Sequence, residues 1–285
     1  MSLSAMSRKM ILVAAIALGC AGPGFSPLSA AEKMTPEKLV SLHLDAIGPA
    51  DVRTGMKSRV FRGEGVWRVF QGGHARLPGT VLEASDGNSI SLRFDTDGNP
   101  TYYGEHLVYN GKNVRIFQGF PGGRSPLGAY CMTNKALLRE GLLGGVTSTA
   151  WTLLHLEARG AKLKYAGLRK VEGRPLHRLD YKVRKGGGPE TVQLFFEPYT
   201  YRHFQTRYSN AAYGRVATTM VTETFSNFQH VDGLTLPARW KIHYNRSVQG
   251  GGPGSMVAEW EFAFKTVVHN QPIDPSLYEL GTAAR

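Results

Sequence analysis

The chain has 285 residues, of which 42% are hydrophobic and 20% charged, so it can bury a core and does not have a disordered composition. Its formal net charge of +12 favours anionic partners such as acidic proteins or lipid head groups. The basic residues are spread out, with only four in the densest stretch (178–185), which argues against a nucleic-acid-binding protein.

Residues 1–31 are predicted to be a secretory signal peptide. Arg8 and Lys9 form a positive region, and the apolar run Met10–Cys20 is too short to span a bilayer as a helix. Ser29-Ala30-Ala31 has the small residues of a cleavage site. Loss of Arg8 and Lys9 with the signal would lower the formal charge from +12 to +10 and leave one exported domain, 32–285.

Cys20 offers an alternative to simple cleavage. The run Ala17-Leu18-Gly19-Cys20 is similar to a bacterial lipoprotein site, except that Ala replaces the leading Leu. A lipid anchor at Cys20 is therefore a second reading of this segment. If Cys20 leaves with the signal, Cys131 is the remaining cysteine and no intramolecular disulfide can form, so stability must come from core packing.

A helix is predicted directly after the signal. Thr35-Pro36-Glu37 combines a preferred N-cap, a proline suited to the first helical position and an acid in the first turn. Gly48-Pro49 predicts its end. The apolar stripe consists of Leu39, Val40, Leu42, Leu44 and Ile47, so one face of this helix should pack against the rest of the domain.

From Lys57 the pattern alternates between apolar and polar residues, which predicts strands. The expected strands of the first half are 57–70, 77–85, 89–95, 101–109 and 112–119. The dipeptides Asp86-Gly87, Asp97-Gly98 and Asn110-Gly111 predict tight hairpin turns between them, as Asp232-Gly233 does later in the chain.

The middle of the chain is predicted to leave the sheet. Residues 119–133 indicate a loop, and Asn134 could cap a helix that contains Leu137, Leu138, Leu142 and Leu143. Gly144-Gly145 should break or kink that helix before an apolar segment, 147–156. The glycine pair predicts either a hinge or a place of close packing.

Strands resume after this segment, at 161–171, 174–184, 190–197, 201–209, 215–229, 234–248 and 255–268. In the last strand, Trp260, Phe262 and Phe264 share one face, and charged residues share the other. The predicted fold is mainly β (α+β): one strongly curved antiparallel sheet of about ten to twelve strands, a half-barrel whose concave face is covered by helices.

Catalytic signatures are absent from the sequence. It has no Walker loop, G-x-S-x-G, H-E-x-x-H or C-x-x-C, so no catalytic residue, metal site or cofactor is predicted. The nine histidines lack the local spacing of metal-ligand pairs. Candidate acid/base carboxylates are Asp45, Asp95, Glu105, Asp180 and Glu197, each more simply interpreted as a solvated residue.

The large aromatic residues carry more information, because a curved sheet often leaves an apolar cavity that its own side chains do not fill. The residues predicted to line such a cavity are Trp67, Trp151, Leu154, Trp240, Trp260, Phe262 and Phe264. In this hypothesis Trp151 and Leu154 face the aromatic residues of the last strand, and a hinge at Gly144-Gly145 admits an acyl chain.

Four stretches, 39–65, 165–183, 225–244 and 261–280, together resemble the LolA/LolB-like superfamily, which includes outer-membrane lipoprotein-sorting proteins and LppX-type lipid carriers. The features that carry the resemblance are Ala46-Ile47-Gly48, Leu234-Thr235-Leu236-Pro237 after Asp232-Gly233, and the Asn270-Gln271-Pro272-Ile273-Asp274 tail. The resemblance implies an antiparallel half-barrel with helices plugging an apolar cavity, and binding without catalysis.

The protein is expected to be a periplasmic carrier of a lipid or of lipoprotein acyl chains, and outer-membrane lipoprotein sorting is one role that such a carrier could have. The protein would be a monomer that works with an inner- or outer-membrane partner protein, without nucleic acid. Two alternatives share the export signal: an outer-membrane β-barrel, which the predicted helices and the Ala-Ala-Arg terminus fit badly, and a hydrolase whose site has no local signature.

Overall fold

The alternating segments fold as strands of one sheet in the computed structural model, which describes residues 33–184, 188–211 and 216–280. The predicted signal peptide and Cys20 lie outside the described residues. The strands are β1 (Ser58–Gln71), β2 (Ala75–Asp86), β3 (Ser89–Thr96), β4 (Gly104–Tyr109), β5 (Val114–Ile116), β6 (Lys162–Val171), β7 (Arg174–Lys182), β8 (Thr191–Phe196), β9 (His203–Ala211), β10 (Ala217–Val231), β11 (Leu234–Val248) and β12 (Met256–His269).

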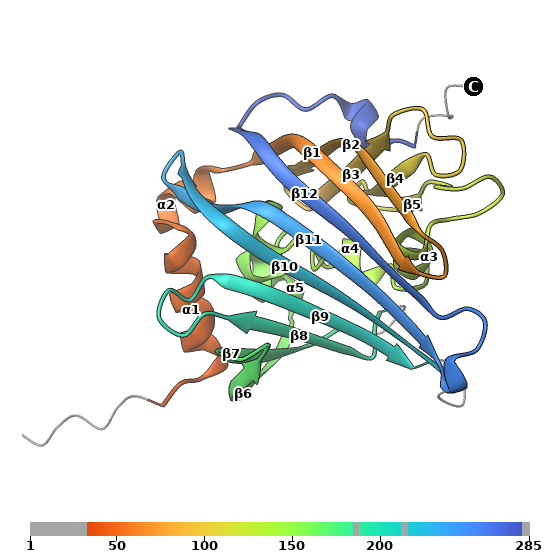
Figure 1. Cartoon of the computed structure of the whole chain (residues 1–285). Coiled ribbons are helices and arrows are strands. Elements are labelled where there is room, and N and C mark those ends of the chain that lie inside the picture. Colours follow the sequence, from red (N-terminus) through yellow and green to blue (C-terminus); the bar gives the residue numbers. More distant parts are fainter. Residues whose placement is uncertain (1–32, 185–187, 212–215, 281–285) are drawn as a thin grey trace, which may run out of the picture. The chain divides into compact units, whose positions relative to one another are not determined.

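The sheet has the order β5-β4-β3-β2-β1-β12-β11-β10-β9-β8-β7-β6, and all its ladders are antiparallel. It therefore consists of two meanders that meet where β1 pairs with β12 (Figure 1). The edges are β5 and β6. The predicted fold, a single curved antiparallel sheet with helices, is confirmed.

Two-residue turns close the β6–β7 and β10–β11 hairpins. Glu172-Gly173 and Asp232-Gly233 have positive φ at both residues, as the tight turns favoured by right-handed strand twist require. Asp97-Gly98 is different, because the connection it begins extends to Gly104. There the Asn99 side chain accepts hydrogen bonds from the backbone of residues 101 and 102 and stabilises a longer loop.

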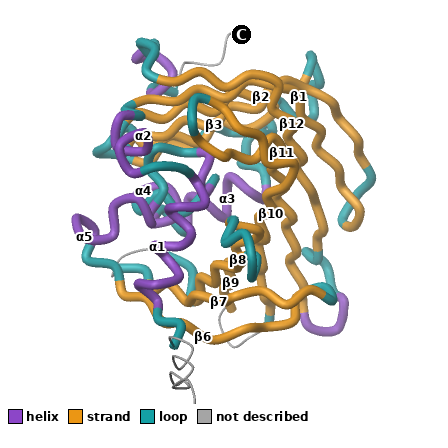
Figure 2. Tube along the Cα trace, turned by 90° about the vertical axis from the view of Figure 1, so that its left-hand side faces the viewer, coloured by secondary structure: helices purple, strands orange, loops and turns teal. Residues whose placement is uncertain are grey.

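The helical segments are α1 (Pro36–Ile47), α2 (Ala50–Gly55), α3 (Pro126–Thr133), α4 (Ala136–Arg139), η1 (Gly145–Thr147), η2 (Thr152–His155), α5 (Leu156–Arg159), η4 (Gln249–Gly251) and η5 (Pro275–Tyr278). In Figure 2, α1, α2, α4 and α5 lie together on one side of the curved sheet. Thr35 caps α1 as predicted, since its Oγ1 accepts a hydrogen bond from the Lys38 amide at 3.2 Å.

The middle segment differs from its prediction. The expected loop 119–133 contains α3, which begins where the Ser125 hydroxyl accepts a hydrogen bond from the Gly128 amide at 2.8 Å. The helix expected from Asn134 is reduced to the four residues of α4. It ends at Arg139, two residues before Gly141. Gly141 has φ +61° and packs so closely that a Cβ would lie 1.7 Å from the Ala150 carbonyl oxygen. Beyond it, the described chain forms the short helical pieces η1, η2 and α5 before β6.

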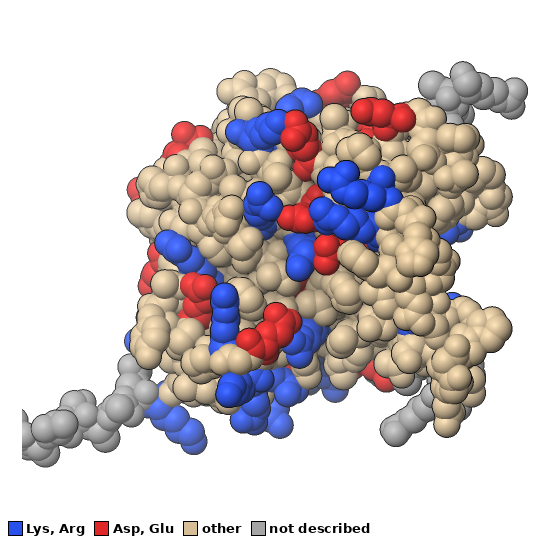
Figure 3. Space-filling model, viewed as in Figure 1, with Lys and Arg blue, Asp and Glu red and all other residues tan. Residues whose placement is uncertain are grey.

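The two faces of the sheet have opposite character. On β12, Trp260 and Phe262 are completely buried on the helix side. On the outer face, Glu259 and Glu261 form ion pairs with Arg68 on the neighbouring strand β1, at 3.3 and 2.9 Å. Figure 3 shows basic and acidic side chains beside one another over this face. The apolar packing, and any apolar site, is therefore on the helix side.

Candidate functional site

Six of the seven residues predicted to line a cavity are side chains of the packed core. Their exposed fractions are 6% or less, and Leu154 alone is partly exposed. Trp67 and Trp260 lie on paired strands with ring centroids 6.3 Å apart, and Trp240 and Phe262 lie 5.4 Å apart. The structure thus brings the aromatic residues of β1, β11 and β12 together, as one cluster beneath the sheet.

Trp151 lies elsewhere in the core, against α1. Its Nε1 donates a hydrogen bond to Nε2 of His43 at 3.1 Å, and Nδ1 of His43 lies 3.0 Å from the Tyr201 carbonyl oxygen. Nδ1 must therefore carry the proton that the carbonyl accepts, which leaves Nε2 as an acceptor. Burial lowers the pKa of His43 to about 4, so the ring is neutral. This chain of bonds fixes Trp151 to α1.

A cleft lies beside α1, where the helices do not fully cover the sheet. It consists of two cavities of about 420 and 800 Å³, which share Leu44, Arg53, Leu154 and His155. We call them the inner and the outer cavity. Of the seven residues predicted to line an apolar cavity, only Leu154 lines either of them.

The outer cavity runs between α1 and the segment 153–163. Its apolar residues are Val40, Leu44, Leu153, Leu154, Leu156, Ala158, Ala161 and Leu163. The polar residues of its lining include Glu37, Asp45 and Glu157. Asp45 is 71% exposed and lies 3.7 Å from Arg53. The walls are therefore mainly aliphatic, with charged groups among them.

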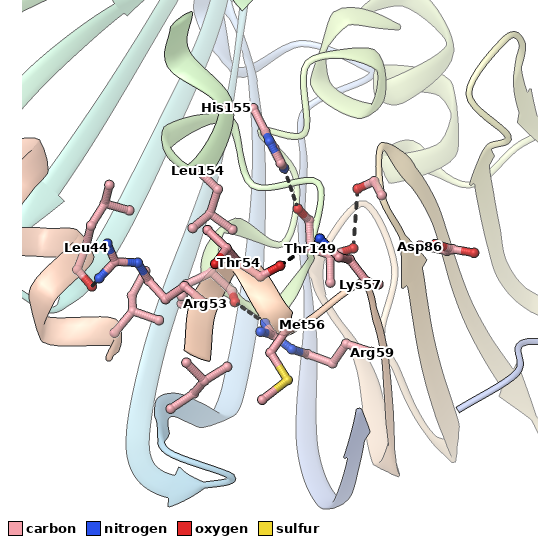
Figure 4. A pocket seen from close by; sticks show the side chains of 14 residues that line it. Leu44, Arg53, Thr54, Met56, Lys57, Arg59, Asp86, Thr149, Leu154 and His155 are labelled. Atoms are coloured by element: carbon pink, nitrogen blue, oxygen red, sulfur yellow. Dashed lines mark hydrogen bonds between the residues drawn. The ribbon is translucent and has the colours of Figure 1, made fainter. Parts of the chain in front are cut away.

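The inner cavity lies deeper, between α2, the start of β1 and residues 146–155. It is lined by three basic side chains, Arg53, Lys57 and Arg59, and by one acid, Asp86, together with aliphatic residues. In the close view of Figure 4, Leu154 and His155 lie on one side of the cavity and Met56 and Arg59 on the opposite side.

Arg59 is buried, with 4% of its surface exposed. Its guanidinium donates to the carbonyl oxygens of Val146 and Thr147, at 2.8 and 3.0 Å, and to Nε2 of His269 at 3.0 Å. His269 in turn contacts Asp232 through Nδ1, at 2.8 Å. Burial lowers the pKa of Arg59 to about 10, so it is charged at neutral pH.

Two buried acids hold the segment 144–149 against the sheet. Glu83 accepts a hydrogen bond from the Thr147 hydroxyl at 2.8 Å, and Glu223 accepts one from the Gly144 amide at 2.8 Å. Burial raises the pKa of Glu83 to about 8 and that of Glu223 to about 7. This segment forms one wall of the inner cavity, so these acids position the wall.

Glu105, expected to be solvated, is 3% exposed, and this prediction is wrong. Tyr102 donates a hydrogen bond to its carboxylate at 2.8 Å and accepts one from Trp260 Nε1 at 2.7 Å. Burial raises the pKa of Glu105 to about 7. Glu105 occupies an inward-facing position of β4, and the hydrogen bond from Tyr102 supplies its buried carboxylate with a partner.

The basic residues of the inner cavity were not anticipated from the sequence, although a signal exists. Arg59 has the same parity as Phe61 and Trp67 on β1, and alternation therefore places it on the buried face. A cation among apolar residues on the inward face of a strand is unusual, since burying a charge is costly. That pattern marks Arg59 for attention.

Among the described ranges, no group of three or more His, Cys, Asp or Glu side chains could hold a metal ion. None of the described helices has the length and apolar character needed to cross a bilayer.

No protein-family model and no curated protein sequence matches the chain. Among solved structures, a LolA superfamily protein from Nitrosomonas europaea aligns with a TM-score of 0.48 and 14% identity, over 86% of this chain and 98% of that one. An outer-membrane lipoprotein-sorting protein domain from Vibrio parahaemolyticus gives 0.45 and 11%, over 85% and 97%. A DUF1329 family protein from Desulfovibrio piger gives 0.41 and 9%, over 85% and 96%. These neighbours include the superfamily that the sequence resembles, and the likeness says nothing about what this chain binds.

Proposed function

We propose that this protein is a non-enzymatic carrier that binds an apolar ligand, a lipid or the acyl chain of a lipoprotein, in the cleft beside α1. The observation that carries the proposal is the aliphatic wall of the outer cavity, which adjoins the inner one at Leu44 and Leu154. Ligand sites in proteins are typically clefts of about 300–1,000 Å³ with mainly apolar walls.

The energetics of such a cleft suit an alkyl chain. Each methylene that leaves water for an apolar environment contributes about 0.8 kcal/mol. A chain of a dozen carbons lying between α1 and residues 153–163 would gain several kcal/mol even if only half of it were covered. A ligand in this cleft does not require the core to open, because the cleft lies beside α1. The aromatic cluster beneath the sheet is closely packed and is not part of the cleft.

The polar groups of the cleft support binding rather than catalysis. His155, the histidine of the lining, has its Nε2 2.9 Å from the carbonyl oxygen of Thr149. That nitrogen therefore donates its proton to the carbonyl, and among the described residues no serine, cysteine or carboxylate side chain is hydrogen-bonded to the ring as a catalytic partner. A hydrolase remains the competing function, and turnover of ester substrates by the purified protein would favour it.

The proposal includes export. We expect removal of residues 1–31 to release a monomeric domain, 32–285, into the periplasm, where an inner- or outer-membrane protein would exchange ligand with it. The intact mass of protein purified from the periplasm tests the first step. The mass of a chain that begins at Glu32 would fit cleavage after Ala31, whereas the mass of a chain with a lipidated Cys20 at its N-terminus would support the anchored alternative.

The binding site is tested by replacing Leu154 with aspartate. Burial of a leucine is worth about 1.5–3 kcal/mol, so Leu154→Asp should weaken binding of dodecanol by about tenfold to a hundredfold. Affinity can be measured by displacement of the fluorescent probe N-phenylnaphthylamine. Leu168→Asp is the matched control, because Leu168 is 51% exposed on edge strand β6. Equal dodecanol affinity in both variants would contradict the site.

A further inference from the structure

The inner cavity has a charge that an alkyl chain does not use. Three basic side chains and one acid line it, and the deepest of the basic groups, Arg59, is buried among apolar residues. An apolar ligand alone would bring no negative charge to these groups. The cavity therefore differs in chemistry from the outer one, although the two adjoin each other at the residues that they share.

The contacts of Arg59 are all with neutral acceptors. Its nitrogens bond to two carbonyl oxygens and to a histidine nitrogen, and no carboxylate of the described residues forms an ion pair with it. Since Nε2 of His269 accepts this bond, the proton of that ring is on Nδ1, where it is donated to Asp232. His269 is thereby a neutral acceptor as well.

The nearest buried acid does not supply a full counter-charge. Glu83 interacts with Arg59 electrostatically, but burial raises the pKa of Glu83 to about 8, so this carboxyl is largely protonated at neutral pH. A buried cation without an ionised partner is costly, and an anion that reaches it is bound strongly.

Two more basic groups surround the same space. Arg53 donates to the carbonyl oxygens of Leu44 and Gly48 at the end of α1, and its side chain is 13% exposed. Lys57 is exposed, and its Nζ donates to the Thr54 carbonyl oxygen at 2.8 Å. The lysine is free to turn toward a ligand, whereas Arg53 is fixed where the two cavities join.

We propose that the inner cavity binds the anionic head group, a carboxylate or a phosphate monoester, of a single-chain amphiphile whose tail lies in the outer cavity. This inference rests on the proposed function and adds the ligand class. Arg53 donates to the carbonyl oxygens through Nη1 and is suited to bidentate contact with such a head group through Nε and Nη2. Arg59 can offer Nη2, since its Nε and Nη1 already donate, and Lys57 adds a mobile charge. The tail follows the aliphatic wall from Leu44 and Leu154 toward Leu163.

A series of ligands with one tail and different heads tests the inference on the exported protein. Dodecanoate and dodecyl phosphate should bind about tenfold or more tightly than dodecanol at pH 7, and dodecyltrimethylammonium should bind more weakly than dodecanol. The advantage of the anions should shrink in high salt. Inorganic phosphate is included to separate a lipid head-group site from a site for free anions.

The outcomes separate this inference from the function on which it rests. Equal affinities for dodecanoate and dodecanol would overturn the head-group site and leave the apolar cleft intact. Failure of all the dodecyl ligands to bind would overturn the proposed function itself. Inorganic phosphate that binds as tightly as dodecyl phosphate would show an anion site with no role for the tail.

Variants assign the head group to these residues. Lys57→Gln should weaken the binding of dodecanoate several-fold and leave the binding of dodecanol unchanged. Arg59→Met should remove the preference for dodecanoate over dodecanol. Lys112→Gln is the control, because Lys112 is exposed in the turn between β4 and β5. If circular dichroism shows that Arg59→Met does not fold, the ligand series and Lys57→Gln still test the head-group site. Folded variants that keep the full anion preference would refute the assignment.

Discussion

Gly145 illustrates how a single residue fixes the segment beneath the sheet. Its φ is +52°, and a Cβ there would lie 2.8 Å from Nδ1 of His203 and 3.0 Å from Cζ of Phe225. The sequence left open whether Gly144-Gly145 is a hinge or a point of close packing. The contacts of Gly145 are those of close packing.

Gly145→Ala should therefore destabilise the protein by more than the backbone strain alone. We expect a loss of about 2–4 kcal/mol, because the added methyl group overlaps two buried rings. Gly98→Ala is the matched control, since Gly98 has φ +61° and no atom within 4 Å of the added Cβ; it should cost only about 1 kcal/mol. Urea unfolding measures both. Equal losses would mean that the contact with His203 has no energetic importance.

The buried Glu83 should make stability depend on pH. Its pKa is about 8 in the folded protein against an ordinary value of 4.5, so the folded state keeps a proton that the unfolded state has lost between those values. The contribution of Glu83 is thus fully present below pH 4.5 and is lost as pH rises through 8, at up to about 1.4 kcal/mol per pH unit. Glu83→Gln, which carries no titratable proton, should flatten this decline. Unfolding free energies at pH 5, 6.5 and 8 test it, and an unchanged slope in the variant would count against the buried acid.

At the scale of elements, α1 is the wall of the cleft and Thr35 is its cap. Thr35→Ala removes the side-chain acceptor of the Lys38 amide and should lower stability by about 1 kcal/mol. A thermal melt of the variant measures this change. The midpoint should fall by a few degrees, and an unaltered midpoint would mean that water replaces the hydroxyl at no cost.

The strands could be predicted closely from the sequence, whereas the middle segment could not. In β12 the alternation of Trp260 and Phe262 with acids matches the observed burial residue by residue. Residues 134–156 are apolar on most sides, so periodicity does not show where helices end there. The start of α3 carries the same Ser/Thr-Pro signal at Ser125-Pro126 that identified α1, but the surrounding glycines and prolines made the stretch resemble a loop.

The candidate site was predicted only in part for a related reason. Size and hydrophobicity select Trp151, Trp240 and Trp260, but those properties also select residues that fill a core, and these do. The cleft depends on how α1 and the segment 153–163 pack, which no local pattern reports. Leu154 is both apolar and placed in the cleft, so it was predicted correctly as a lining residue. The position of Arg59 on the inward face of β1 was the available clue to the basic groups of the inner cavity.

The order of strands in the sheet determines how late in synthesis the sheet can be completed. β1 and β12 are neighbours at its centre, with Arg59 opposite His269 and Trp67 opposite Trp260, although about 190 to 210 residues separate these partners in the chain. Contacts between such distant residues form slowly, because the loss of chain entropy precedes the gain from pairing. Both meanders therefore have an unpaired inner edge until residues 256–269 have been synthesised. A nascent chain of this design cannot complete its sheet until residue 269 has been synthesised, because the strand that joins the two meanders is the last one made.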